Sequence, residues 1–276
     1  MPEWLIAVVL GVVEGVTEFL PVSSTGHLIL AGELLRFVGE RAETFEIFIQ
    51  LGAVLAVAVL YRDRFAALGW PGSRDVAVLL RGRREERLSW AHVAVACLPA
   101  FVLGFLLHGT IKRHLFSSRT VLVGLVLGGV LMIAAEVWLR RRRDAALATT
   151  MDALSLRQAL AIGCIQCLAL WPGFSRSGST ISGGLLAGLD RRTAAEFSFV
   201  VAVPVMLVAT VYDLARSLAL LDAAFLVTIA IGFVVSYLVA QVAVVTFLRF
   251  IQRVSLTPFA IYRFVLAGLY VLVVLR

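Results

Sequence analysis

Residues 14–27 read EGVTEFLPVSSTGH and place two carboxylates, two serines, a threonine and a histidine in an otherwise apolar N-terminal region. A second polar segment, PGFSRSGST at 172–180, interrupts an apolar run in the second half. The apolar helices expected around the first segment, at about 4–20 and 27–38, are each too short to span a membrane, which takes roughly 20 residues. Irregular backbone at membrane depth must be buried in protein or line a wet cavity, so each polar segment is predicted to break a re-entrant helical hairpin.

The composition indicates an integral membrane protein. Hydrophobic residues make up 61% of the 276 residues, whereas soluble domains are nearer half apolar. We therefore predict an all-α polytopic membrane protein, a single domain over 1–276, with six transmembrane helices plus two re-entrant helical hairpins. The six spans are expected at about 45–61, 90–109, 120–139, 194–212, 223–248 and 258–275.

Basic residues between the apolar runs set the expected orientation. The chain has 25 Lys and Arg against 18 Asp and Glu, an excess that would suggest nucleic acid as the partner of a soluble protein. Here the arginines gather in the loops 62–89 and 140–157, at 191–192 and at 249–253. Because basic loops stay on the cytoplasmic side, we expect no nucleic-acid partner and place both termini outside. The shorter basic loop 110–119 argues weakly against this orientation.

The two halves of the chain resemble each other. Four positions match at an offset of 152 residues, namely Gly11 with Gly163, Glu14 with Gln166, Ser23 with Ser175 and Gly26 with Gly178. Each half then consists of one hairpin followed by three spans, and this odd number of spans turns the second half upside down in the membrane. The sequence therefore predicts an inverted-topology repeat, 1–139 and 152–276, with a ligand site at the midplane where the repeats meet.

The first polar segment has the residue types of a phosphoryl-transfer site. Glu14 and Glu18 share one helix face, where two buried carboxylates require a nearby cation, either a divalent metal or an arginine. Ser24 and His27 can meet on the first turn of the next helix, and a serine or histidine nucleophile beside a carboxylate fits phosphoryl or acyl transfer. The helix start offers three further phosphate-binding candidates, Ser23, Thr25 and Gly26.

Arg176 is the candidate phosphate-binding cation of the second segment. Its planar, always charged guanidinium suits phosphate, and the short helix that follows presents free N–H groups and a positive end to an anion. As a mere topology marker it would lie at membrane depth without a partner, so we assign it a catalytic role. The phosphate-binding set expected around Arg176 is Ser175, Ser177, Gly178 and Thr180.

These segments resemble the family of undecaprenyl-pyrophosphate phosphatases linked to bacitracin resistance. The similar motifs are E-x-x-x-E at Glu14–Glu18, S-S-T-G-H at Ser23–His27 and P-G-x-S-R-S-G-S-T at Pro172–Thr180, with further similar segments at 45–50 and 194–199. The resemblance covers nearly the whole chain and implies a bacterial inner-membrane hydrolase that removes the terminal phosphate of undecaprenyl pyrophosphate and recycles this lipid carrier for cell-wall synthesis. It also implies a divalent cation, Mg²⁺ or Ca²⁺, and a site that opens toward the periplasm.

Two alternative functions have to be weighed against hydrolysis by this family. A lipid phosphatase of the phosphatidic-acid type needs a histidine after its serine–arginine pair, but no histidine follows Ser175–Arg176, which excludes that family. A transporter or flippase of a polyprenyl phosphate or another anion would also suit an inverted repeat, although pure transport needs no nucleophile.

The sequence leaves three points of the mechanism and assembly open. The attacking group is either Ser24, with His27 or Glu18 as its base, or His27 itself, or water. A metal binds either Glu14 and Glu18 directly or only the pyrophosphate. The expected partners are the polyprenyl pyrophosphate substrate and membrane lipids, and formation of a homodimer is a further option.

Overall fold

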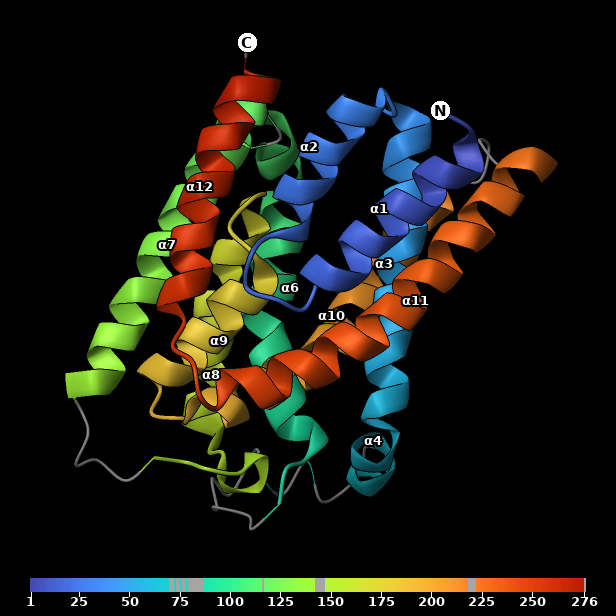
Figure 1. The fold of residues 1–276 in the computed structure, drawn as a ribbon. Coiled ribbons are helices and arrows are strands. Elements are labelled where there is room, and N and C mark those ends of the chain that lie inside the picture. The colour runs from blue at the N-terminus through green and yellow to red at the C-terminus, as the bar shows by residue number, and fades with distance from the viewer. Residues whose placement is uncertain are drawn as a thin grey trace.

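The computed structural model describes residues 1–275 except 70, 71, 73, 74, 76, 77, 79–86, 116, 142–146 and 218–221, and within helices it leaves out the side chains of 108, 112 and 212–217. Much of the basic loop 62–89, with Arg142 and Arg143, therefore lies outside the described residues. The described part is helical, and its only β-type pairing is an isolated bridge between Ala148 and Leu189. The helices form one bundle with both termini at the same end (Figure 1).

Six described helices are long and apolar enough to cross a membrane, which confirms the predicted number. They are α3 (Glu40–Leu60), α6 (Trp90–Leu115), α7 (Ser118–Arg141), α10 (Arg191–Ser217), α11 (Ala223–Ile251) and α12 (Thr257–Val274). Within α6 and α10 the membrane-compatible parts are Trp90–Leu107 and Arg191–Val211. The long apolar runs thus form helices because a helix satisfies all its backbone hydrogen bonds within one segment.

Four shorter helices flank the two polar segments. The first segment lies between α1 (Glu3–Thr17) and α2 (Ser24–Leu35). The second lies between α8 (Leu156–Gln166), extended by the 3₁₀ turn η2 (Cys167–Leu170), and α9 (Arg176–Leu186). We call 18–23 the first break and 171–175 the second break. That these helix pairs turn back inside a membrane, and that the halves form an inverted repeat, remain predictions.

The helix after the first break begins earlier than the sequence indicated. We expected it from about residue 27, whereas α2 begins at Ser24. The Ser23 side chain accepts a hydrogen bond from the Gly26 N–H at 3.3 Å, which caps the helix at Ser23. Ser24 and Thr25 are therefore helical residues rather than residues before the helix.

Close backbone contact fixes α1 against α11. A Cβ atom added to Gly11 or Gly15 would lie 2.7 Å from the carbonyl oxygen of Gly232 or Ser236. Small residues at this spacing let two helices approach until their backbones touch, which is a common way of packing helices in membranes. The contact holds α1, and with it Glu14, in a fixed position in the bundle.

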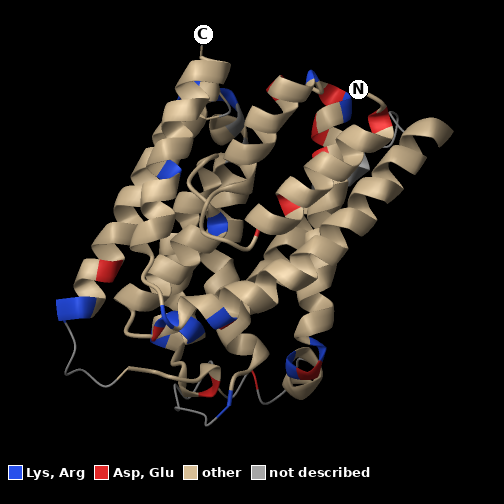
Figure 2. Ribbon diagram, viewed as in Figure 1, with Lys and Arg blue, Asp and Glu red and all other residues tan. Residues whose placement is uncertain are grey.

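The end of the bundle opposite the termini is rich in charge. Figure 2 shows basic residues spread across this end, from the end of α7 to α4 (Arg62–Leu68). Glu136 of α7 is 1% exposed and accepts hydrogen bonds from the side chains of Arg191 and Arg140 and from the Leu256 N–H. This carboxylate ties α7 to α10 and to the turn before α12, and removing one partner would leave a buried charge uncompensated.

Asp152, in the 3₁₀ turn η1 (Met151–Ala153), connects two other segments at this end. It accepts hydrogen bonds from the Leu88 N–H and from Arg64 Nη1, both at 3.0 Å. Burial acts to raise the pKa of Asp152, but these hydrogen bonds and the charges of Arg64 and Arg87 outweigh it, so the pKa lies below its ordinary value.

Replacing Asp152 with Asn should therefore lower stability at neutral pH. A depressed pKa means that the stabilisation is complete above the unfolded value of about 3.9 and disappears as the pH falls through the lower folded value. We expect the thermal midpoint of the detergent-solubilised protein to drop by roughly 2–4 °C at pH 7, and the difference from wild type should begin to shrink only as the pH falls below about 4.

Asp63→Asn is the matched control, since Asp63 faces Arg62 at 3.7 Å with its side chain 95% exposed. This change should leave the midpoint where it is, because exposed ion pairs contribute little. Equal midpoints for Asp152→Asn and wild type at pH 7 would contradict the stabilising role of Asp152.

Candidate active site

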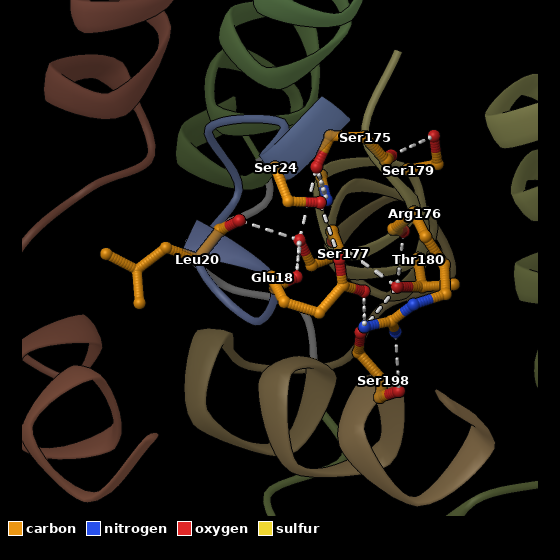
Figure 3. A network of polar contacts seen from close by, with 10 residues as sticks. Glu18, Leu20, Ser24, Ser175, Arg176, Ser177, Ser179, Thr180 and Ser198 are labelled. Atoms are coloured by element: carbon orange, nitrogen blue, oxygen red, sulfur yellow. Dashed lines mark hydrogen bonds and ion pairs between the residues drawn. The ribbon is translucent and has the colours of Figure 1, made fainter. Parts of the chain in front are cut away.

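The two breaks contact each other directly. The Ser177 hydroxyl, at the start of α9, lies 2.8 Å from the carbonyl oxygen of Leu20 and 3.4 Å from that of Glu18. Figure 3 shows these contacts inside one polar network, with the Leu20 side chain pointing away from it. Residues 157 positions apart in the sequence therefore belong to one cluster.

The Glu18 carboxylate joins the two breaks. Its Oε2 accepts a hydrogen bond from the Ser24 hydroxyl at 2.5 Å, and its Oε1 accepts one from Arg176 Nη2 at 3.2 Å (Figure 3). Both partners of this ion pair are buried, with side-chain exposures of 6% for Glu18 and 12% for Arg176. Arg176 thus supplies Glu18 with the positive partner that a buried carboxylate requires.

Arg176 is held from three sides and keeps one donor free. Its Nη1 donates to the Ser198 carbonyl of α10 at 3.2 Å, and its guanidinium carbon lies 5.4 Å from the centre of the Phe19 ring. Its Nε is buried and has no hydrogen-bond partner among the described residues. A buried donor without a partner marks a place for an acceptor atom of a ligand.

Among the described residues, Glu14 is a buried acceptor without a partner, whereas Arg176 Nε is a buried donor without one. It is 1% exposed, and both of its carboxylate oxygens lack a hydrogen-bond partner within the part of the chain that the structure describes. The charged groups that act on it are Glu18, Glu46 and Arg176. Buried acceptors are rarely left unpaired, so these oxygens mark a place for a cation.

The donor set fits a divalent cation that is shared with a phosphate ligand. The described residues contain no group of three or more His, Cys, Asp or Glu side chains that could hold a metal. Mg²⁺ in proteins is usually held by one or two carboxylates, with substrate phosphates and water as the other ligands. Glu14, one helical turn before Glu18, can supply such a carboxylate, whereas Glu18 already binds Ser24 and Arg176.

The two helix starts at the cluster have the same backbone geometry. Ser23 and Ser175 have φ values of 72° and 74°, in the left-handed region that non-glycine residues seldom adopt. Each side chain caps its helix by accepting a hydrogen bond, from the Gly26 N–H at 3.3 Å and from the Gly178 N–H at 3.1 Å. Strained residues of this kind concentrate at functional sites, and two helix N-termini at one cluster favour an anion.

His27 faces α12 instead of Ser24. Its Nδ1 lies 2.7 Å from the Ser23 carbonyl oxygen, and since a carbonyl only accepts, Nδ1 carries the proton. Its Nε2 lies 2.7 Å from the Tyr262 hydroxyl, and the two rings stack at an interplanar angle of 8°. Of the two bases expected for Ser24, the structure therefore pairs it with Glu18 and not with His27, because the stacked Tyr262 holds the imidazole.

The other predicted phosphate-binding residues differ in their positions. Ser175 bonds both Ser177 Oγ, at 3.1 Å, and the Gly178 N–H, so it lies within the network. Thr25 is exposed. Thr180 is buried. Its hydroxyl donates to the Arg176 carbonyl at 2.9 Å and lies 2.5 Å from Ser198 Oγ, so it contacts the backbone of Arg176 and the helix α10.

Sequence reasoning missed the contribution of α12. Tyr262 sits in an apolar run, where an aromatic residue has no distinguishing feature. The neighbouring Arg263 did offer a signal, because an ionisable residue inside a membrane span is a functional candidate by default. Ser198 of α10 contributes a backbone carbonyl, which no sequence pattern can reveal.

Comparison with known proteins finds relatives that match the whole length of the chain. Residues 7–269 match the family described as bacitracin resistance protein BacA. Three similar proteins, each named undecaprenyl-diphosphatase 1, align over 275 residues that cover 100% of both chains. They are 52% identical in Bacillus cereus (strain ZK / E33L), 51% in Bacillus thuringiensis (strain Al Hakam) and 50% in Bacillus anthracis.

Proposed function

We infer the activity from one premise, that this chain belongs to the bacitracin resistance protein BacA family. Relatives that are 50–52% identical over the full length are named undecaprenyl-diphosphatases. The protein is a multi-pass membrane hydrolase that converts undecaprenyl pyrophosphate to undecaprenyl phosphate and phosphate. The structural observation that carries this conclusion is the hydrogen-bonded chain from Ser24 through Glu18 to Arg176, which combines a nucleophile, a base and a cation. Pure transport of an anion would not need this combination.

Substrate binding in our proposal uses buried groups that lack hydrogen-bond partners among the described residues. The terminal phosphate lies between the N-termini of α2 and α9, where backbone N–H groups favour an anion. Arg176 Nε, the free buried donor, binds one of its oxygens. A divalent cation, Mg²⁺ or Ca²⁺, would be held by Glu14, next to Glu18, together with pyrophosphate oxygens, and would neutralise phosphate charge.

The proposed nucleophile is Ser24. Its hydroxyl already donates to Glu18 Oε2, so Glu18 accepts the proton as the Ser24 Oγ–phosphorus bond forms. The bond between the terminal phosphorus and the bridging oxygen breaks, and undecaprenyl phosphate leaves. Water then attacks the phosphorus of the phosphoserine and the Ser24 Oγ–phosphorus bond breaks. The proton held by Glu18 returns to Ser24, and the protons of the water leave with the released phosphate. Attack by His27 is disfavoured because Nε2, its unprotonated nitrogen, would first have to leave the Tyr262 hydroxyl.

We place the protein in a bacterial inner membrane with the site open to the periplasm. Two observations support this orientation. Basic residues gather at the end of the bundle opposite the termini, which the rule for basic loops assigns to the cytoplasm. The helices α1 and α2 lie toward the end that carries the termini (Figure 1). Hydrolysis there returns the lipid carrier to its monophosphate form for cell-wall synthesis.

Hydrolysis and its cation requirement can be tested together. Purified protein in detergent should release phosphate from undecaprenyl pyrophosphate, and a chelator should suppress the release until Mg²⁺ or Ca²⁺ is restored. Glu14→Gln should raise the Mg²⁺ concentration needed for half-maximal activity, because its carboxylate no longer holds the cation.

Glu33→Gln serves as the control, since Glu33 is an exposed residue of α2. It should behave like wild type at every Mg²⁺ concentration. Full activity after exhaustive chelation would show that the mechanism needs no divalent cation. A protein that releases no phosphate under any of these conditions would refute the proposed hydrolase activity.

The nucleophile can be identified by substitution and trapping. Ser24→Ala should lower turnover by more than about 10³-fold, whereas His27→Ala should leave slow turnover of roughly 1–10%. Acid quenching of wild type during turnover should trap an acid-stable phosphoserine at position 24, detectable by mass spectrometry.

Ser182→Ala is the matched control, because Ser182 is fully buried in α9 and its hydroxyl has no partner among the described residues. It should keep normal turnover. An acid-labile phosphohistidine at position 27, or substantial turnover by Ser24→Ala, would show that Ser24 is not the nucleophile.

A further inference from the structure

Arg263 of α12 is a fully buried cation whose hydrogen bonds within the described part of the chain all go to backbone carbonyls. Its exposure is 0%. Its Nε donates to Leu125 at 3.1 Å and its Nη1 to Phe174 at 3.0 Å, while its Nη2 donates to Gly124 at 3.0 Å and to Gly173 at 2.9 Å. Among the described residues no carboxylate forms an ion pair with it. One side chain thus joins three segments, α12, α7 and the second break.

Two glycines of α7 make room for this arrangement. A Cβ atom on Gly124 would clash with the carbonyl oxygen of Pro172, and a Cβ atom on Gly128 would clash with Arg263 Nη2 and lie 2.5 Å from the Phe174 carbonyl oxygen. The second break therefore lies directly on the backbone of α7, with the guanidinium packed into the contact. Gly173, whose carbonyl accepts from Arg263, has a φ of +86°, a left-handed conformation that glycine adopts at little steric cost.

The bonded carbonyls immediately precede the phosphate-binding groups. Gly173 and Phe174 lead into Ser175, which caps α9, and into Arg176, which binds Glu18. Arg263 Nη1 also lies 3.3 Å from the position that a Cβ atom on Gly178 would take. The guanidinium is therefore in contact with the first turn of α9 as well as with the backbone before it.

We propose that Arg263 is a positioning residue for the hydrolysis, acting through the backbone of Gly173 and Phe174 to place Ser175 and Arg176. This role rests on the proposed hydrolase function. A charged residue within a span is unfavourable, so its presence in α12 calls for a specific gain. The planar guanidinium offers five N–H donors in a fixed fork, whereas a lysine offers three on a flexible stem and cannot bond the same four carbonyls.

The test compares two arginine-to-lysine variants. Arg263→Lys keeps the charge but frees the second break, and should lower kcat per folded protein by roughly 10–100-fold, because small misplacements of a reacting or binding group have effects of this size. Arg191→Lys is the control, since Arg191 bonds the buried Glu136 at the end of the bundle opposite the termini. It should lower the thermal midpoint and leave kcat per folded protein within about twofold of wild type.

A double-mutant cycle separates positioning from general stability. If Arg263 acts through the second break, Arg263→Lys and Ser175→Ala disturb the same helix start, so the double variant should lose clearly less activity than the product of the two single losses. Combining Arg191→Lys with Ser175→Ala should instead multiply the single effects, because the two sites share no partner.

Gly128→Ala should disturb the contact between Arg263 and the second break independently of Arg263→Lys. The added methyl group would occupy the place of Arg263 Nη2 without changing any charge. It should reproduce the loss of kcat, and its loss should likewise overlap with that of Ser175→Ala.

Several results would overturn the assignment of Arg263. They are normal kcat in folded Arg263→Lys, losses that multiply in the cycle with Ser175→Ala, or failure of both Arg263→Lys and Gly128→Ala to fold, which would make the contact purely structural. A wild-type protein that releases no phosphate would be a different outcome, since it would refute the proposed function and the positioning role with it.

Discussion

The ion pair between Glu18 and Arg176 is the interaction on which the site depends. Placing one charged side chain at the centre of a membrane costs about 2.5–3.5 kcal/mol on insertion scales, and removing one partner of a buried pair leaves the other uncompensated. These two residues are 158 positions apart in the chain. Their pairing brings the first and second breaks together, and Ser24 and the Ser198 carbonyl complete the hydrogen bonds around it.

The second constraint is the backbone of the breaks themselves. An interrupted helix leaves N–H and carbonyl groups without intrahelical partners, and lipid offers none. Side chains of the breaks and of the helices around them satisfy several of these groups. Ser23 and Ser175 accept from the N–H groups at the starts of α2 and α9, Ser177 contacts the Leu20 carbonyl, and Arg263 binds the carbonyls of Gly173 and Phe174. Two buried groups at the site, the Glu14 carboxylate and Arg176 Nε, have no hydrogen-bond partner among the described residues, and our proposal assigns them to the cation and the pyrophosphate.

The sequence predicted the fold class and the composition of the cluster better than its pairings. Long apolar runs determine the six long helices, and charged residues in apolar surroundings must find partners, which is why Glu18 and Arg176 stood out. Which residue pairs with which depends on tertiary contacts that no local pattern contains. The sequence left both His27 and Glu18 open as the base for Ser24, and the structure pairs Ser24 with Glu18, since Tyr262, inconspicuous in an apolar run, holds the imidazole. The inverted repeat rests on four matched positions and remains a prediction.

The central claim is that both breaks form one phosphate site, and an experimental structure of the protein with bound orthovanadate tests it most directly. Vanadate mimics a phosphoryl group under attack. We predict that it lies between the N-termini of α2 and α9, bonded to Ser24 Oγ and in hydrogen-bond contact with Arg176. Vanadate that contacts only one break, or that binds elsewhere in the bundle, would contradict the account.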